Sequence, residues 1–579
     1  MKNYRQTHEF ESLTAWAKSN GAFIYDDLIF ISGESSNCGA CYTTAAIPPS
    51  TRLLAIPHSL AITYSNAVSQ FPPELSEAGT PVTHFAVISA FLALEKLKGS
   101  DGFWHPYIAT LPSVELGCGG PLFQSPEIIH LWLEGTNLSA REIEIVKEDW
   151  RQDWKCIKDV LGSIEGWEAH AESLTWELYL WAASMFASRA FPDKLLSWDS
   201  SSTTPPVPQL KTQVNEDGTT QIFQDGVETG AKPALFPILD MLNHKPHTKI
   251  TWQLEQNDIG FTGEEFLEKG TEVFNNYGPK PNQQLLLSYG FAIQDNPNDT
   301  VMLKLKPPLD SVRQAIRDEQ ISAKDDIGTY HLGVNDPTPP IELVQLFRII
   351  VANQWELEVL QNSPKDPIMG RNEIAAKTQI LRSLQMKLST HSCGRRATDD
   401  KIGKSQFGNY ATIFRNGQIQ ILRSAILRHQ DELKELYSCC LIVSLEELTR
   451  PYRKFSKAIE TCFGDFDDRA ATGMDEVVFM LAICNILLEN QKGNSFLAPQ
   501  IKELLKHYPL NIAGNNEEEA RVKQLYEDLF PALAEACPKI FGDNRWTFDL
   551  LRRGSRILLG ESLKLSVDGH EDDFLVFSR

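Results

Sequence analysis

Two groups of strand-like segments lie far apart in this chain of 579 residues, and a helical stretch separates them. The first group, "AFIYDDLIFIS" and "TRLLAIPHSLAIT", carries β-branched and aromatic residues between turn signals within residues 22–64. The second group, "KITWQLE", "DIGFTG" and "TEVFNNYG", begins near residue 249. Between the groups, Phe85, Ile88 and Leu92 recur at helical spacing. The pattern predicts one β-rich domain that is interrupted by a helical insertion.

The predicted fold class is α+β, with this β-rich domain followed by a mostly α-helical domain. The first domain is expected over residues 1–300, with its helical insertion at about 65–190 and a polar loop at about 197–233. The second is expected over residues 301–579, with amphipathic segments at 340–360, 371–388, 415–437, 474–490 and 521–536. Its longest apolar run, Val477 to Leu488, is too short to span a bilayer, so we expect a core helix and no membrane partner.

The charge balance limits the kind of partner. A formal net charge of −21 argues against direct binding of nucleic acid, because phosphate contacts need a basic surface. The same charge suits a basic protein. The ten cysteines are scattered and the first residues hold no apolar signal core, which favours a reducing compartment. We expect a cytoplasmic monomer, and presence in the nucleus as well is left open.

Several polar and aromatic residues follow apolar segments between residues 234 and 291. Asp240, Asn243 and His244 stand at the end of "ALFPILDMLNH", where each needs a hydrogen-bond partner or a ligand. Tyr277 precedes Gly278, and "SYGF" places Tyr289 and Phe291 on either side of a glycine. Each feature alone is common at turns. Their concentration within about fifty residues indicates a functional site.

These segments resemble the SET-domain protein methyltransferases, in particular the group of the Rubisco large-subunit methyltransferase and the fungal ribosomal-protein lysine methyltransferases. The matching pieces are "HFAVISAFLALEKLKGSDGFWHPYIATLP", "LTWELYLWAASMFASRAF", "PILDMLNH" and "FNNYGPKPNQQLLLSYGF", in the family's order across residues 35–300. In the C-terminal half the best local match to the family's helical substrate-binding domain is "FRNGQIQILRSAI".

The resemblance implies S-adenosylmethionine as the cofactor. Asn243 and His244 would contact it through backbone and amide groups, and Arg189 would lie near its carboxylate. The family's Gly-x-Gly loop corresponds here to "NCGAC", so cofactor contacts are also expected from Asn37, Cys38 and Gly39. This loop keeps one glycine only. Cys38 and Cys41 form a lone C-x-x-C without two further ligands nearby, so no metal site is expected.

The resemblance also implies the acceptor site. Tyr277 is expected to be the central catalytic residue, because methyl transfer to an amine depends on positioning and electrostatics. Asp240 and Arg189 would face the substrate side. Tyr289 and Phe291 would line a narrow apolar channel, which lowers the pKa of a lysine through desolvation.

The predicted function is therefore methyl transfer from S-adenosylmethionine to a lysine of a basic protein, with a ribosomal protein as the target class that the resemblance implies. Two alternatives stay open. One is a histidine methyltransferase of the same fold. The other is a non-catalytic SET-fold protein-binding module, which the altered glycine loop weakly favours. The sequence does not identify the target protein, the residue or the number of methyl groups added.

Overall fold

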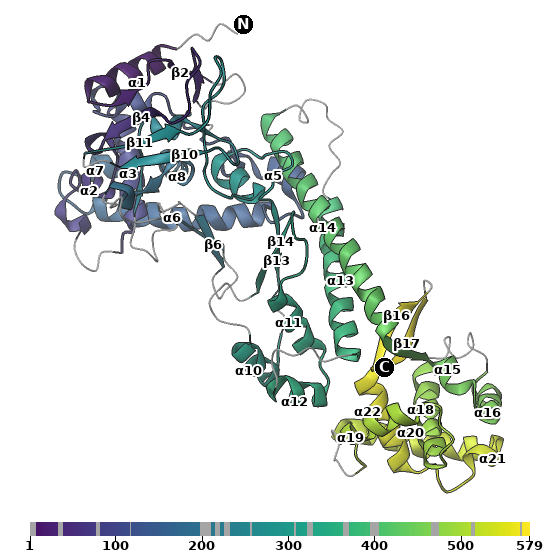
Figure 1. Ribbon diagram of the computed structural model, residues 1–579. Coiled ribbons are helices and arrows are strands. Elements are labelled where there is room, and N and C mark those ends of the chain that lie inside the picture. Colours follow the sequence, from purple (N-terminus) through teal and green to yellow (C-terminus); the bar gives the residue numbers. More distant parts are fainter. Residues whose placement is uncertain are drawn as a thin grey trace. The chain divides into compact units, whose positions relative to one another are not determined.

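The structure is a computed structural model of the chain. It describes residues 7–32, 39–76, 81–115, 117–196, 210–214, 220–224, 232–254, 257–305, 308–320, 328–362, 370–393, 405–464, 474–510, 516–567 and 570–578. The chain forms two compact units (Figure 1). The first contains residues 1–305, 326–337 and 386–424, and the second contains residues 306–325, 338–385 and 425–579. The units therefore do not divide at a single point near residue 300.

An antiparallel sheet of order β1-β4-β11-β10 joins the two strand groups of the first unit. It consists of β1 (Phe23–Ile24), β4 (Thr51–Pro57), β11 (Asp258–Gly263) and β10 (Ile250–Leu254). Phe261 pairs with Leu54 on one side and with Trp252 on the other. The pairing of segments two hundred residues apart confirms the α+β fold with an interrupted β-rich region.

The first unit also contains smaller strand pairs. They are β2 (Leu28–Ser32) with β3 (Gly39–Thr43), β5 (Phe191–Pro192) with β8 (Pro233–Ala234), β13 (Thr300–Lys304) with β14 (Thr329–Gly333), and the parallel pair β9 (Asn243–His244) with β12 (Phe274–Asn275). Within the expected polar loop, β6 (Leu210–Val214) pairs with β7 (Thr220–Gln224), and most of the remaining loop lies outside the described residues. The β9–β12 pair carries two of the predicted site residues, Asn243 and His244.

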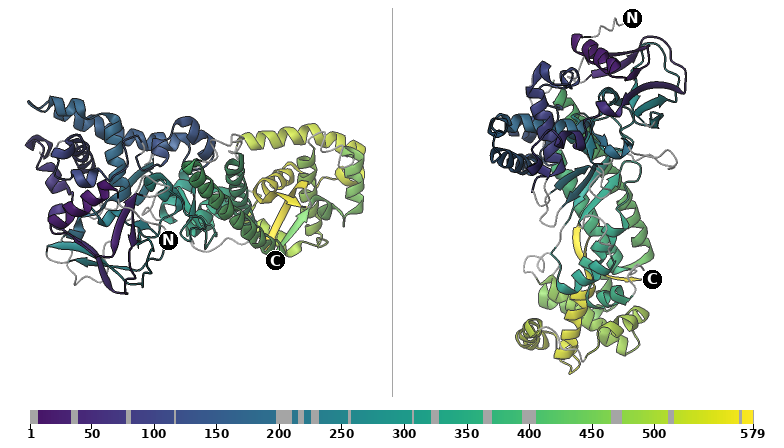
Figure 2. Two further views of the ribbon diagram at one scale, coloured as in Figure 1. Left: turned by 90° about the horizontal axis from the view of Figure 1, so that it is seen from above. Right: turned by 90° about the vertical axis from the view of Figure 1, so that its left-hand side faces the viewer.

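The helical insertion forms a layer of packed helices to one side of the strands, as the two views of Figure 2 show. Thr83 and Thr175 cap the N-termini of two of them, with side-chain oxygens that accept from Ala86 N and Leu178 N. The helices of this unit up to residue 190 are α1 (His8–Ser19), α2 (Tyr64–Val68), α3 (His84–Leu97), α4 (His105–Ile108), α5 (Pro126–Leu133), α6 (Ala140–Gly162), α7 (Glu168–Ser173) and α8 (Trp176–Arg189).

Helix α8 ends at Arg189 because the next residue, Ala190, turns to extended backbone ahead of Pro192. Trp181 in this helix is fully buried, and its indole nitrogen donates to the Pro112 carbonyl oxygen at 2.9 Å. The helix is thereby fixed in the core, and its last residue is held at the edge of the strands.

The second unit is helical with one small sheet. Its elements are α10 (Ser311–Gln320), α11 (Ile341–Val351), α12 (Gln354–Asn362), α15 (Leu445–Thr449), α16 (Arg453–Phe463), α18 (Asp475–Gln491), α19 (Ala498–His507), α20 (Asn516–Ala536), α21 (Pro538–Phe541) and α22 (Phe548–Glu561). The long helices α13 (Arg371–Cys393) and α14 (Gln406–Cys439) contribute to both units. An antiparallel sheet of order β15-β17-β16, not expected from the sequence, uses Cys440–Ser444, His570–Ser578 and Ser562–Val567.

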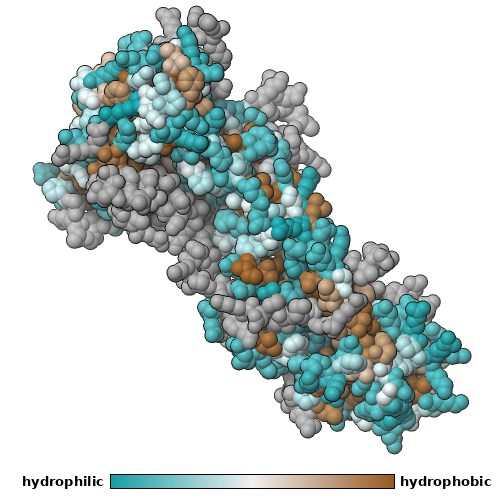
Figure 3. All heavy atoms as spheres, viewed as in Figure 1, coloured by the Kyte–Doolittle hydropathy of each residue, from teal (hydrophilic) through white to brown (hydrophobic). Residues whose placement is uncertain are grey.

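The apolar run Val477 to Leu488 lies within α18 and is buried from Val478 onward, which confirms the predicted core helix. Among the helices of the described residues, none is sufficiently long and apolar to cross a bilayer. The surface in Figure 3 is mainly hydrophilic, with hydrophobic side chains in small groups. Most of the large apolar side chains are therefore buried in the core of each unit.

Candidate active site

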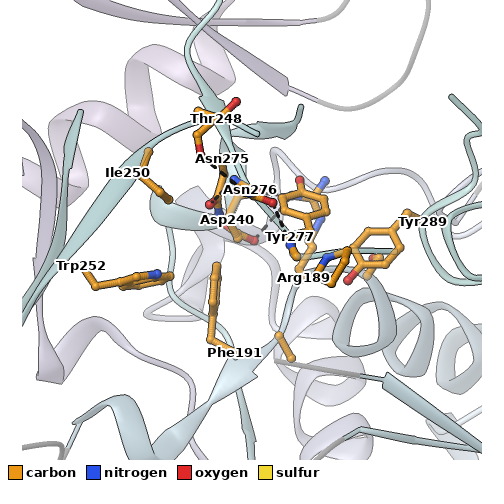
Figure 4. Close-up of a pocket in the computed structure, with 14 residues that line it drawn as sticks. Arg189, Phe191, Asp240, Thr248, Ile250, Trp252, Asn275, Asn276, Tyr277 and Tyr289 are labelled. Atoms are coloured by element: carbon orange, nitrogen blue, oxygen red, sulfur yellow. Dashed lines mark hydrogen bonds and ion pairs between the residues drawn. The ribbon is translucent and has the colours of Figure 1, made fainter. Parts of the chain in front are cut away.

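A cavity of about 320 Å³ lies in the first unit, where the end of α8 meets the sheet and the β9–β12 region. Figure 4 places the rings of Phe191 and Trp252 on one side of it and those of Tyr277 and Tyr289 on the other. The lining residues are Ser188, Arg189, Ala190, Phe191, Asp240, Thr248, Ile250, Trp252, Asn275, Asn276, Tyr277, Gly278, Pro279 and Tyr289. The pocket thus has mainly apolar walls and a few polar groups, which is the usual composition of a ligand pocket.

A buried charge cluster forms one part of the lining. Asp240 stands in a short 3-10 turn (Leu239–Met241) that follows Ile238, whose φ of 76° lies in the left-handed region. Tyr107 Oη donates to Asp240 Oδ2 at 2.6 Å. Arg189 Nη1 donates to the Asp240 carbonyl oxygen at 3.1 Å and lies 3.5 Å from Oδ2. Oδ1 accepts no hydrogen bond within the described part of the chain, although it is buried.

Burial shifts the titration of this cluster. Desolvation raises the pKa of Asp240, and the positive charge of Arg189 and the hydroxyl of Tyr107 act in the opposite direction. Burial also raises the pKa of Tyr107 well above its usual value, so this phenol remains a neutral donor. Arg189 therefore balances a carboxylate of the chain itself, and its predicted contact with a cofactor carboxylate stays a prediction.

Tyr277 is held at both ends. Its hydroxyl donates to the Leu242 carbonyl oxygen at 2.8 Å, and its backbone N–H donates to His244 Nδ1 at 3.0 Å. Its ring stacks between His244, with centroids 4.9 Å apart, and Tyr289, with centroids 5.1 Å apart. The hydroxyl proton is engaged by Leu242, so the oxygen presents its lone pairs as an acceptor.

His244 supports Tyr277 in its neutral form. Desolvation lowers the pKa of His244 to about 4, which keeps the imidazole ring neutral near neutral pH. Only an unprotonated Nδ1 can accept the Tyr277 N–H. The role that the structure gives this side chain is therefore to orient the tyrosine, and its predicted cofactor contact remains a prediction.

Asn243 lies next to the pocket and not in its lining. Its amide nitrogen donates to Glu272 Oε1 at 2.8 Å and lies 3.5 Å from the carbonyl oxygen of Gly39. At Gly39, an added Cβ would approach the ring of Phe10 to 2.6 Å, so a larger residue does not fit there. The chain thus brings the one glycine of its altered loop beside Asn243.

The predicted site residues therefore separate into three sets. Arg189, Asp240, Tyr277 and Tyr289 line the pocket together. Gly39, Asn243 and His244 lie behind it, and Phe291 packs edge-on against Tyr289 with ring centroids 6.2 Å apart, outside the lining. Asn37 and Cys38 lie outside the described residues. Cys41 is fully buried and burial raises its pKa, so it is a neutral thiol.

The sequence analysis missed the apolar wall of the pocket. Phe191 stacks on Phe236 at 5.2 Å and meets Trp252 edge-on at 5.3 Å. Ile250 lies in the same strand as Trp252, two residues earlier. The alternation of β10 was visible in the sequence and gave a signal that these two side chains share a face.

Gly290 fixes the position of Tyr289. Gly290 directly follows the π-helical turn Leu285–Tyr289 and has a φ of 79°. A Cβ at Gly290 would collide with the carbonyl oxygen of Cys118. The Tyr–Gly–Phe sequence therefore needs its glycine both for the backbone conformation and for close packing.

No family model matches the chain. It is 26% identical to the ribosomal lysine N-methyltransferase set10 of Schizosaccharomyces pombe, across 92% of this chain and 94% of the relative. It is also 26% identical to the protein-lysine N-methyltransferase EFM1 of Saccharomyces cerevisiae, across 93% of each. A crystal structure of the SET domain of LSMT bound to MeLysine and AdoHcy superposes with a TM-score of 0.56, at 16% identity, over 75% of this chain and 94% of that chain.

The chain has the fold of a SET domain. It is similar to these two fungal lysine methyltransferases over more than nine tenths of its length, as its motifs predicted. In this chain the stretches that carried the resemblance, "PILDMLNH" and "FNNYGPKPNQQLLLSYGF", meet at the pocket and at the β9–β12 pair directly behind it.

Proposed function

We propose that this SET-domain protein is an S-adenosylmethionine-dependent methyltransferase that modifies a lysine side chain of a ribosomal protein. The observation that carries the proposal is the pocket beside Tyr277, whose hydroxyl is fixed by the Leu242 carbonyl oxygen at 2.8 Å. The names of the fungal relatives support both the reaction and the target class.

The residues behind the pocket fit the cofactor. S-adenosylmethionine supplies a methyl group on a positively charged sulfur. The Asn243 amide on β9 and the backbone at Gly39 on β3 offer hydrogen-bonding groups 3.5 Å apart, and Gly39 lets the chain approach closely. The nearby carboxylate of Glu272 suits a ligand with cationic groups. These residues would hold the cofactor next to the pocket that receives the acceptor.

The pocket itself suits a lysine side chain. The rings of Phe191 and Trp252 and the side chain of Ile250 form an apolar wall along which four methylene groups can pack. Removal of water by these walls lowers the pKa of the amine and favours its neutral, nucleophilic form. The Tyr277 oxygen then accepts an N–H of the amine and aligns its lone pair for in-line attack.

Asp240 acts on the same amine. Its Oδ1 is buried, accepts no hydrogen bond from the described residues, and belongs to a residue that lines the pocket. This oxygen is available to a lysine that enters as an ammonium ion. Arg189 offsets part of the Asp240 charge, so that the amine is bound without being held in its protonated form.

A histidine acceptor fits this pocket less well. An imidazole needs a hydrogen-bond partner for each ring nitrogen. The wall formed by Phe191 and Ile250 offers none, and the amide of Asn276 is already used, since its oxygen accepts from Gly278 N at 3.0 Å and its nitrogen lies 3.4 Å from the Thr248 carbonyl oxygen. This side of the pocket therefore offers more to the methylene groups of a lysine than to the ring nitrogens of a histidine.

A ribosomal target also agrees with the charge of the chain. Ribosomal proteins are rich in basic residues because they bind RNA. A protein with a formal net charge of −21 attracts such partners over distances of about 8–10 Å at physiological salt. The cytoplasmic location, the monomeric state and the lack of direct nucleic-acid binding remain predictions that go with this proposal.

The test uses the full chain, cofactor with a labelled methyl group, and an extract of cells that lack the protein. We expect label in a ribosomal protein, and mass spectrometry of its peptides should place the methyl group on a lysine. The Tyr277→Phe variant is the matched control and should leave little label. Label on histidine would support the histidine alternative. Absence of label together with absence of cofactor binding in calorimetry would support the non-catalytic module.

A further inference from the structure

A carboxylate that the sequence analysis did not single out lies beside Asn243. Glu272 comes two residues before strand β12, and its Oε1 accepts from the Asn243 amide nitrogen at 2.8 Å. Its Oε2 lies 3.4 Å from the Tyr42 hydroxyl. Tyr42 and Glu272 form an isolated antiparallel bridge, and the next residue, Val273, donates its N–H to the Cys41 carbonyl oxygen at 2.8 Å. Backbone pairing therefore fixes Glu272 between β3 and the strand that carries Asn243.

The neighbours of Asn243 determine which way its amide faces. Glu272 Oε1 and the Gly39 carbonyl oxygen both lie next to the amide nitrogen, and both can only accept hydrogen bonds. A flipped amide would direct its oxygen at two acceptors, which is repulsive. The Asn243 amide oxygen therefore faces away from these two groups, and it accepts no hydrogen bond from any described residue.

The charge of Glu272 has no neutralising partner in the part of the chain that the structure describes. Among the described residues, no Lys, Arg or His forms an ion pair with its carboxylate. Its charge acts on its surroundings, since it adds to burial in raising the pKa of the Cys41 thiol. An amide oxygen backed by an unbalanced carboxylate favours a ligand group that is both cationic and a hydrogen-bond donor.

We propose that Glu272 is a positioning residue for the cofactor, which orients the Asn243 amide oxygen toward the α-ammonium group of S-adenosylmethionine and places a negative charge near it. The inference rests on the proposed methyltransferase function. The amino-acid end of the cofactor carries the only primary ammonium group of that molecule, and a charge-assisted hydrogen bond is about twice as strong as a neutral one. Glu272 thus acts through Asn243 and does not touch the reacting atoms.

The experiment compares three ligands by isothermal titration calorimetry. S-adenosylmethionine and S-adenosylhomocysteine both carry the amino-acid end, and 5′-methylthioadenosine lacks it. The Glu272→Gln variant keeps an oxygen for the Asn243 amide and removes the charge. We expect it to weaken binding of the first two ligands by about 10-fold, the factor that charge assistance gives. The affinity for 5′-methylthioadenosine should stay within about 2-fold.

Tyr42→Phe serves as the matched control. It removes the long 3.4 Å contact to Glu272 and leaves both the charge and the Asn243 hydrogen bond, so all three affinities should change by less than about 2-fold. The melting temperature of each variant without ligand should stay close to that of the wild type, because Glu272 is only half-buried.

Two results would overturn the inference while the proposed function stands. The first is equal affinity of wild type and Glu272→Gln for S-adenosylmethionine. The second is a parallel loss of affinity for all three ligands, which would assign Glu272 a purely structural role. If the wild type itself binds neither S-adenosylmethionine nor S-adenosylhomocysteine, the proposed function fails first, and the inference fails with it.

Discussion

Two buried charge clusters, one in each unit, are built from similar residues and are satisfied differently. In the second unit, Glu356 is fully buried and both of its oxygens accept, with Arg371 donating at 3.2 and 2.6 Å and the Asn353 N–H at 2.9 Å. In the first unit, Asp240 is also buried, yet its Oδ1 accepts nothing from the described residues. Asp240 lies in the lining of the pocket beside Tyr277, whereas Glu356 does not line that pocket.

The comparison teaches that burial of a charge does not by itself mark a functional site. The Glu356 cluster extends to Glu561, whose Oε1 accepts from Trp355 at 2.7 Å and from Tyr508 at 2.8 Å. These bonds tie α12, α13, α19 and α22 together within the second unit and use both carboxylate oxygens of Glu356. A buried acceptor that is left unused costs free energy, and a ligand is one way to complete it when the residue also lines a pocket.

The largest effect is expected at Tyr277, beside the incompletely satisfied cluster. Tyr277→Phe removes the oxygen that aligns the amine, so we predict a fall in kcat of about 100-fold or more, as for loss of one oriented polar group in other enzymes. Cofactor affinity should stay within about 3-fold, since Tyr277 lies on the acceptor side. Single-turnover methyl transfer and calorimetry measure the two quantities. An unchanged rate would remove Tyr277 from the reaction.

The next effect is on stability and belongs to the second unit. Glu356→Ala leaves Arg371 buried without its partner, which costs about 3–5 kcal/mol in comparable cases. Urea denaturation should show this loss, whereas the kcat of the remaining folded enzyme should be unaltered. A change in kcat with no loss of stability would show that this cluster does more than support the fold.

The Asp240→Asn substitution tests whether the Asp240 cluster binds substrate while the Glu356 cluster only supports the fold. The amide retains an acceptor for Tyr107 and removes the charge that meets the incoming ammonium. We predict an increase in KM for the protein substrate of about 10-fold, the loss of a charge-assisted hydrogen bond. The stability change should be smaller than for Glu356→Ala, because one acceptor function is conserved. A KM equal to that of the wild type would argue against contact between Asp240 and the substrate.

The smallest effect concerns pH. His244 has a pKa lowered to about 4 in the folded protein, against 6.5 for the unperturbed group. Between pH 4 and pH 6.5 the unfolded state binds more protons at His244 than the folded state does. The contribution of neutral His244 to the stability of the fold is therefore complete above pH 6.5 and is lost as the pH falls toward 4. His391 shows the same shift, and both belong to the first unit. Replacing His244 with Asn should reduce the pH dependence of the melting temperature in this window. A dependence equal to that of the wild type would assign it to other groups.

Some features of the site could be predicted because their causes are local. Pro192 ends the helix before it, which places Arg189 at a helix terminus in sequence and structure alike. The motifs with Asp240, Tyr277 and Tyr289 were recognisable as short segments, and they do meet in one pocket. Phe291 was expected in the channel from its place in "SYGF", and the pocket lining does not include it.

Other features depend on contacts that no local pattern specifies. The C-terminal sheet was missed because "CLIVS" follows a long helix directly, and a short apolar run has the same appearance in a helix and in a strand. The shared helices α13 and α14 likewise make the boundary between the units invisible to composition. The course of residues 386–424 back into the first unit follows from packing.

The amino-acid sequence by itself determined the helical insertion between two strand groups and the end of α8, because spacing, capping and Pro or Gly placement act over a few residues. The candidate site residues were predicted from the resemblance of short motifs. Only the tertiary structure decided that Tyr107 meets Asp240, that Phe191 faces Trp252, and that Glu272 supports Asn243. Those contacts depend on strand register and on competition for burial across the whole chain, and such terms have no local signature.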